Sequence, residues 1–139
     1  MILNKISITN FINHGQLDLE LPDPSIPLYI SGANGSGKTS VAEAVYLLLT
    51  LRTFRQQSLS DIRSFNADYM RVQGCFSEDA YVEEAVFFYQ QERKLIINGS
   101  ADIMGTADYS HIMPVICYSP SFETLLSSEH SERRQSIDR

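Results

Sequence analysis

The chain has 139 residues, of which 43% are hydrophobic and 20% are charged, and its formal net charge is −6. These values are typical of one globular domain, which is small for a complete nucleotide-hydrolysing enzyme. An acidic chain gives no support to an extended basic surface for nucleic acid. Binding of nucleic acid at a local patch or in a dimer groove remains an alternative. No apolar run has the length of a membrane span or a secretion signal, so we expect a cytoplasmic protein without membrane contact.

The cysteines and histidines are isolated in the sequence. Cys75 and Cys117 have no CxxC spacing, which favours reduced thiols over a disulfide or a metal pair. His14, His111 and His130 have neither triad nor metal-ligand spacing. We therefore assign no catalytic or ligand role to any of the three histidines.

Two strands are expected at the start of the chain. Residues 2–11 alternate through two isoleucines and predict a strand. Residues 17–21 alternate leucine with an acidic residue, which predicts a half-exposed strand with its leucines inward. The link at His14 and Gly15 predicts that the two strands form a hairpin.

Residues 32–39 read GANGSGKT and match the G-x-x-x-x-G-K-[ST] phosphate-binding loop completely. Its glycines let the backbone curl so that successive N–H groups point into one concavity, as a polyphosphate requires. We expect Lys38 to reach the β- and γ-phosphates as the catalytic residue, and the Thr39 hydroxyl to bind Mg²⁺. The predicted nucleotide-binding residues of this segment are Gly32, Ala33, Asn34, Gly35, Ser36, Gly37, Lys38, Thr39 and Ser40.

The flanks of this loop have the order that the motif requires. Residues 26–31 predict a short buried strand, which follows prolines that interrupt the sheet. A helix of about three to four turns is predicted to begin near Lys38, with its positive dipole end at the loop. Its apolar stripe consists of Val41, Val45, Leu48 and Leu49. The chain is therefore expected to bind a nucleoside triphosphate.

Beyond this helix the sequence predicts antiparallel structure rather than repeated βα units. Residues 52–66 indicate a loop with a short helix, Asn98-Gly99 marks a hairpin, and residues 128–139 are helix-compatible. Strands are expected at residues 69–76, 81–89, 94–97 and 114–118. This order favours an α/β fold of α+β character, a P-loop NTPase of the ATP-binding-cassette type. An antiparallel β subdomain would pack on its phosphate-loop strand and helix.

Several segments resemble the RecF family and its RecN-like and SMC-like relatives, in order along the whole chain. They are ITNFIN at residues 8–13, the phosphate loop and helix start at 32–46, LRTFR at 51–55, KLIING at 94–99, VICYSP at 115–120 and SERR at 131–134. The paired arginines before Ile137-Asp138 are the mark most specific to RecF. The resemblance implies that residues 1–139 are the N-terminal nucleotide-binding lobe of an ATPase head, ending near the start of a coiled-coil arm.

The match departs from the family at two points. Ser121-Phe122-Glu123 stands where an acidic pair is usual, and Ile12 stands where a basic residue near the adenine is common. The sequence also has no Walker B segment ending in Asp-Glu and no close LSGGQ-like signature, both of which the family carries after the arm. We therefore expect this lobe to bind ATP and Mg²⁺ weakly and to hydrolyse almost no ATP by itself.

The resemblance implies an ATP-binding lobe of a DNA recombination and repair ATPase. Its partners would be DNA, a second copy held through ATP between the two heads, and recombination mediator proteins. Two alternatives stay open. One is the head of another SMC-like ATPase, in chromosome organisation or phage defence, and the other is a nucleotide-binding scaffold without hydrolysis. The residues do not decide between ATP and GTP, because no NKxD-type guanine reader is present.

Several further residues have a structural interpretation beside a functional one. Arg55 is expected, in preference to Arg52, to reach a nucleotide, or DNA across a dimer. The equal alternative is that Arg55 is a solvated surface residue. Gln56 and Gln57 are interpreted as exposed loop residues in preference to groups that position water. Arg133 and Arg134 are as readily explained by ion pairs with acidic residues on one helix as by contacts with DNA. The aromatic residues at 87–89 are interpreted as core and sheet-edge residues in preference to a platform on which bases stack.

Overall fold

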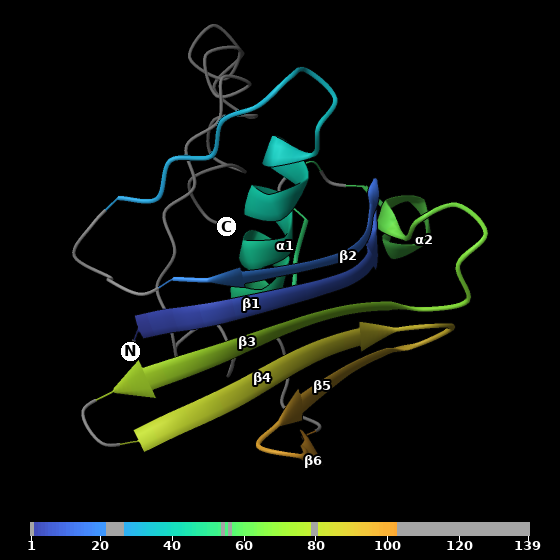
Figure 1. Cartoon of the computed structure of the whole chain (residues 1–139). Coiled ribbons are helices and arrows are strands. Elements are labelled where there is room, and N and C mark those ends of the chain that lie inside the picture. Colours follow the sequence, from blue (N-terminus) through green and yellow to red (C-terminus); the bar gives the residue numbers. More distant parts are fainter. Residues whose placement is uncertain (1, 22–26, 54, 56, 79–80, 103–139) are drawn as a thin grey trace, which may run out of the picture.

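The computed structural model of the chain describes residues 2–21, 27–53, 55, 57–78 and 81–102 (Figure 1). The elements in chain order are β1 (Ile2–Phe11), β2 (His14–Glu20), α1 (Lys38–Thr50), α2 (Leu59–Ile62), β3 (Met70–Glu78), β4 (Tyr81–Tyr89), β5 (Arg93–Ile97) and β6 (Ser100–Asp102). The strands and helices that we predicted within these residues are confirmed, with one exception described below. The strand predicted at residues 114–118, the helical end at 128–139, Cys117, Gln56 and the arginine pair lie outside the described residues.

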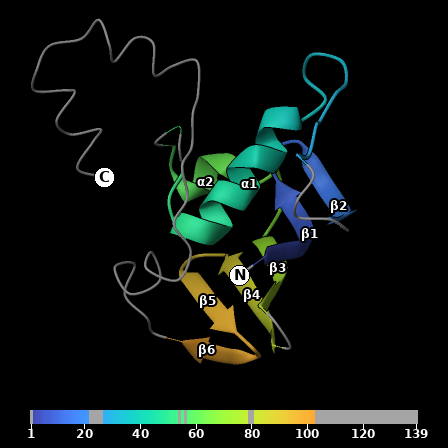
Figure 2. The ribbon, with the colours of Figure 1, turned by 90° about the vertical axis from the view of Figure 1, so that its left-hand side faces the viewer.

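The strands form one antiparallel sheet in the order β2-β1-β3-β4-β5-β6. The chain leaves the sheet after β2, forms the loop and both helices, and returns to pair β3 with β1, with Ile8 opposite Val72. The helix α1 lies against one face of the sheet and contacts β1, β3 and β4, and α2 lies on the same side (Figure 2). The predicted antiparallel subdomain beside a phosphate-loop helix is therefore confirmed.

The core lies between α1 and this face of the sheet. Strand alternation sends one set of side chains toward the helix, because successive residues of a strand point to opposite faces. This set includes Ile6, Ile8, Met70, Val72, Phe76 and Phe87, which meet Ala44, Leu47 and Leu48 of α1. A Cβ atom on Gly74 of β3 would lie 2.6 Å from Cδ2 of Leu48, so a larger residue would force the Leu48 side chain to shift where helix and sheet approach closely.

The structure confirms one predicted hairpin turn and moves another. β5 and β6 are joined at Asn98 and Gly99, whose φ angles of 49° and 78° are those of the expected two-residue turn. β1 and β2 also form the expected hairpin, but Phe11 pairs with His14, so the turn is at Ile12 and Asn13. The prediction that His14 and Gly15 form the link is wrong by two residues, because glycine signals a turn only when the turn needs its conformation.

The buried strand predicted before the phosphate loop is wrong over residues 27–31, the part that the structure describes. These residues form no strand, and the side chains of Leu28, Tyr29 and Ile30 are 60%, 86% and 41% exposed. An apolar run becomes a strand only when a neighbouring strand pairs with its backbone groups. No strand of the described residues pairs with this segment.

Candidate functional site

The phosphate-loop motif forms an open loop that leads directly into α1. Gly35 and Gly37 have φ angles of 80° and 89°, a conformation that L side chains rarely adopt. Gly37 is the N-cap residue of α1 and provides no side-chain cap, and the first turn of α1 contains no acidic residue. The N–H groups at this helix start are therefore directed toward the loop without a capping side chain, as an anion site requires.

The lysine of the motif lies inside the loop. Its Nζ donates hydrogen bonds to the carbonyl oxygens of Gly32 and Ala33, at 2.9 and 2.6 Å. The neighbouring Thr39 is exposed, whereas Ser40 is only 6% exposed. The structure thus brings the ammonium of Lys38 and the side chain of Thr39 to the open end of α1, and it directs Ser40 toward the protein interior. The remaining predicted residues of the loop, Ala33, Asn34 and Ser36, are exposed.

The turn between β1 and β2 holds the loop from outside. Nδ2 of Asn13 donates to the carbonyl oxygen of Gly35 at 3.0 Å, and Nε2 of His14 lies 3.0 Å from the carbonyl oxygen of Gly37. A Cβ atom on Gly37 would overlap the ring of His14. No pattern in the sequence links His14 to the loop, because the contact joins residues 23 positions apart and depends on how the sheet meets α1.

A buried carboxylate lies behind the loop on α1. The Glu43 side chain is 0% exposed. Nε of Arg55 lies 3.5 Å from Oε2 of Glu43, as an ion pair. Burial raises the pKa of the Glu43 carboxyl, and the charge and backbone N–H of Arg55 act in the opposite direction. Arg55, predicted as a nucleotide-binding residue, is thus paired with a carboxylate and remains 43% exposed.

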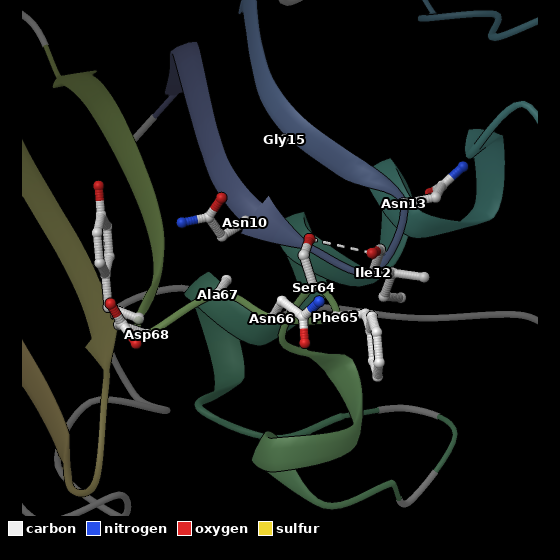
Figure 3. Close-up of a pocket in the computed structure, with 10 residues that line it drawn as sticks. Asn10, Ile12, Asn13, Gly15, Ser64, Phe65, Asn66, Ala67 and Asp68 are labelled. Atoms are coloured by element: carbon white, nitrogen blue, oxygen red, sulfur yellow. Dashed lines mark hydrogen bonds between the residues drawn. The ribbon is translucent and has the colours of Figure 1, made fainter.

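A pocket of about 500 Å³ lies beside the β1–β2 turn and is lined by residues of that turn (Figure 3). Its wall opposite the turn is the segment between α2 and β3, and Figure 3 shows Asn10 and Asn13 at opposite ends of the turn side. The lining includes the polar groups of Asn10, Asn13, Ser64, Asn66 and Asp68, and the ring of Phe65, which is 93% exposed. Asn13 belongs to this pocket and also bonds the loop, so the two features are adjacent.

The backbone around this pocket is strained. Ile12 has a φ angle of 50°, which is unfavourable for a β-branched residue, and Asn10 and Asn66 also have positive φ. The strained turn is held because the Ile12 N–H donates to the carbonyl oxygen of Ile62 at 2.7 Å. Oγ of Ser64 donates to the carbonyl oxygen of Ile12 at 3.0 Å, the bond drawn in Figure 3. Such strain persists only where surrounding contacts fix it, and it is common at binding sites.

The other candidates occupy structural positions. Phe87 is 1% exposed in the core, as predicted, and Gln57 is exposed in the connection before α2. Cys75 is a free thiol on β3. Within the described part of the chain, His, Cys, Asp and Glu side chains form no group of three or more that would hold a metal ion. Neither α1 nor α2 has the length and apolar character needed to cross a membrane.

The family model for the AAA domain matches residues 5–135 of the chain. Curated relatives include the DNA replication and repair proteins RecF of Rickettsia typhi, 26% identical, and of Chlorobium phaeovibrioides, 32% identical. The alignments cover 100% and 99% of this chain but only 38% and 37% of the relatives. The chain thus spans less than two fifths of the length of these proteins.

Two solved structures share the fold. The recombination mediator protein RecF with ATP superposes with a TM-score of 0.79 at 26% identity, over 98% of this chain and 38% of that protein. An SMC ATPase structure, described in work on ATP-driven dimerisation, superposes with a TM-score of 0.74 over 99% of this chain and 98% of that one. Its identity of 21% shows a common fold alone. The predicted P-loop ATPase head fold is confirmed.

Proposed function

The chain belongs to the AAA domain family, with RecF proteins among its relatives, and we propose that it is the ATP-binding lobe of a RecF-like DNA repair and recombination ATPase. The observation that carries this proposal is the position of Lys38. Its ammonium lies inside a loop whose last glycine begins α1 without a side-chain cap. A triphosphate would take the place of the two carbonyl oxygens as the partner of Lys38.

The residues of the loop fit both ATP and Mg²⁺. The exposed Thr39 would bind Mg²⁺ through its hydroxyl, and the ion would neutralise part of the triphosphate charge. Gly35 and Gly37 leave the loop backbone free to approach the phosphates. The other lobe of the site, with the acidic residues that position water, would come from outside residues 1–139. The lobe alone would then bind ATP weakly and turn over almost none.

The nucleoside end of ATP would occupy the pocket beside the β1–β2 turn. Asn13 supports this placement of the nucleoside, because it donates a hydrogen bond to Gly35 of the loop and also lines the pocket. Amide groups at Asn10 and Asn66 offer both donors and acceptors to a base, and the ring of Phe65 offers a stacking surface. Phe65→Ser is expected to weaken binding of ATP but not of inorganic triphosphate. Equal loss for both ligands would contradict this orientation.

The wider role follows from the relatives. In the complete protein, two copies would join through ATP held between their heads, on DNA, in the cytoplasm, with recombination mediator proteins as partners. The RecF relatives are 26% to 32% identical, whereas the SMC structure is 21% identical, which favours RecF over a long-armed SMC protein. This dimer is tested by the sedimentation coefficient of the complete protein, which is expected to increase on addition of ATP and not to do so in Lys38→Ala.

Equilibrium binding of ATP with Mg²⁺ tests the proposal most simply. Lys38→Ala is expected to weaken binding at least tenfold, because a charge-assisted hydrogen bond to phosphate is lost. Lys94→Ala, at an exposed position on β5, makes the same change in net charge and is expected to leave affinity unchanged. Equal affinity of Lys38→Ala and the wild type would contradict the proposal. Turnover of wild type at the rate of an intact ATPase would contradict its status as one lobe of a divided site.

A further inference from the structure

Glu43 is a charged side chain at a position where core packing has no need of one. It lies in the second turn of α1, and its neighbours Ala44 and Leu47 are fully buried apolar residues. Its own side chain is 0% exposed. Burying an ionised carboxylate is unfavourable unless an opposite charge compensates. An apolar residue would fill this position more favourably, so the carboxylate calls for a reason other than packing.

The compensating charge comes from Arg55, in the connection between α1 and α2. The separation of 3.5 Å between Nε and Oε2 is that of an ion pair rather than of a short hydrogen bond. Arg55 lies between α1, which ends at Thr50, and α2, which begins at Leu59. The ion pair therefore joins Arg55 to the second turn of α1, while the Arg55 side chain remains 43% exposed.

The helical spacing places this pair near the phosphate loop. Thr39 and Glu43 are four residues apart, so they lie on the same face of α1, about 6 Å apart along its axis. Thr39 is exposed at the open end of the helix, and Glu43 is buried one turn behind it. Arg55 is accordingly paired about one helical turn behind the open end of α1, where Thr39 is exposed.

We propose that Glu43 is a positioning residue that holds Arg55 so that its guanidinium meets the terminal phosphate of bound ATP. This rests on the ATP binding proposed above. A guanidinium has five N–H donors in a planar fork, so it can pair with a carboxylate on one side and a phosphate on another. Holding the long side chain in place before the ligand arrives reduces the ordering cost of the contact. Glu43 then sets the preference for ATP over ADP without touching either nucleotide.

The ratio of ATP affinity to ADP affinity tests this proposal. The dissociation constants of both nucleotides with Mg²⁺ are measured for the wild type, Glu43→Gln, Arg55→Ala and the double variant. Arg55→Ala is expected to lower the preference for ATP by about tenfold. Glu43→Gln is expected to lower it in the same direction, and the double variant no further than Arg55→Ala alone. Glu92→Gln and Arg93→Ala, both exposed at the β4–β5 turn, are matched controls that leave the ratio unchanged.

The alternative outcomes separate the proposal from simpler explanations. A purely structural Glu43 would lower the melting temperature and both affinities alike, and an unchanged ratio would overturn the proposal. Additive losses in the double variant would also overturn it, since the two residues would then act independently. If Glu43→Gln does not fold, Glu43→Met keeps the length and apolar packing of the side chain and answers the same question. A wild-type chain that binds no ATP would overturn the proposed function as well, whereas an unchanged ratio in a chain that binds ATP overturns this inference alone.

Discussion

Nε2 of His14 lies 3.0 Å from the carbonyl oxygen of Gly37, so the first residue of β2 contacts the last residue before α1. The adjacent Asn13 reaches Gly35 in the same loop. The shape of the phosphate loop is therefore set from two directions, by the helix that follows it and by the hairpin that lies against it. The loop and the sheet are one structural unit, and changes in the hairpin are expected to reach the nucleotide.

Replacement of His14 by alanine is expected to weaken ATP binding several-fold. One hydrogen bond of about 1 kcal/mol is lost, and it holds the loop in its binding shape rather than the ligand itself. His14→Gln places an amide donor near the position of Nε2 and is expected to recover most of the affinity. Calorimetric titration with ATP and Mg²⁺ measures both effects. Equal affinities for His14→Ala and the wild type would show that the hairpin does not hold the loop.

Gly37→Ala is expected to abolish the binding of ATP and to destabilise the fold by about 2–4 kcal/mol. A left-handed alanine costs about 1–2 kcal/mol, and the added Cβ would overlap the His14 ring. Gly99→Ala is the matched control, because its φ of 78° imposes the backbone cost while no atom lies within 4 Å of the added Cβ. Urea denaturation compares the two variants. A Gly37→Ala chain no less stable than Gly99→Ala would contradict the close contact with His14.

The fold and much of the site were predictable from local pattern. The stripe of Val41, Leu48 and Leu49 defines α1, and Asn98-Gly99 fixes a hairpin, because both depend on residues close in sequence. The glycine spacing of the loop likewise determines its curled backbone. Local patterns therefore predicted most of the elements and the curled loop that leads into α1, but not what surrounds them.

The features that sequence reasoning missed depend on partners distant in the chain. The apolar run at Leu28 and Tyr29 resembles a buried strand, but a strand also needs a paired neighbour. Glutamate usually faces solvent on a helix, but the Glu43 side chain is 0% exposed and is paired with Arg55, which lies beyond the end of α1. His14 gave no signal because its acceptor is a backbone carbonyl, which every residue offers.

The stability of the fold is expected to depend on pH through Glu43. Because burial places its folded-state pKa above the ordinary value of 4.5, the carboxyl favours the folded state below that value. This contribution is lost as the pH rises through the folded-state pKa, so the unfolding free energy of the wild type is expected to fall relative to that of Glu43→Gln. Arg55→Ala removes the opposing charge and is expected to enlarge the fall.

Urea denaturation of the three chains at a series of pH values measures this effect. The wild type and Glu43→Gln are expected to differ by an amount that changes with pH, and Arg55→Ala to show the steeper change. Parallel stability curves for the wild type and Glu43→Gln would show that the carboxyl has the same pKa in the folded and unfolded chains. The burial of its charge would then have no energetic consequence.

Amide hydrogen exchange of the chain with and without ATP and Mg²⁺ tests the central claim most directly. The N–H groups of residues 34–40 are expected to become slower to exchange on addition of ATP, because they would donate to phosphate oxygens at the start of α1. Lys38→Ala at the same ATP concentration is expected to show no such protection. Protection confined to other parts of the chain, with exchange at residues 34–40 unchanged, would contradict the assignment of this loop as the triphosphate site.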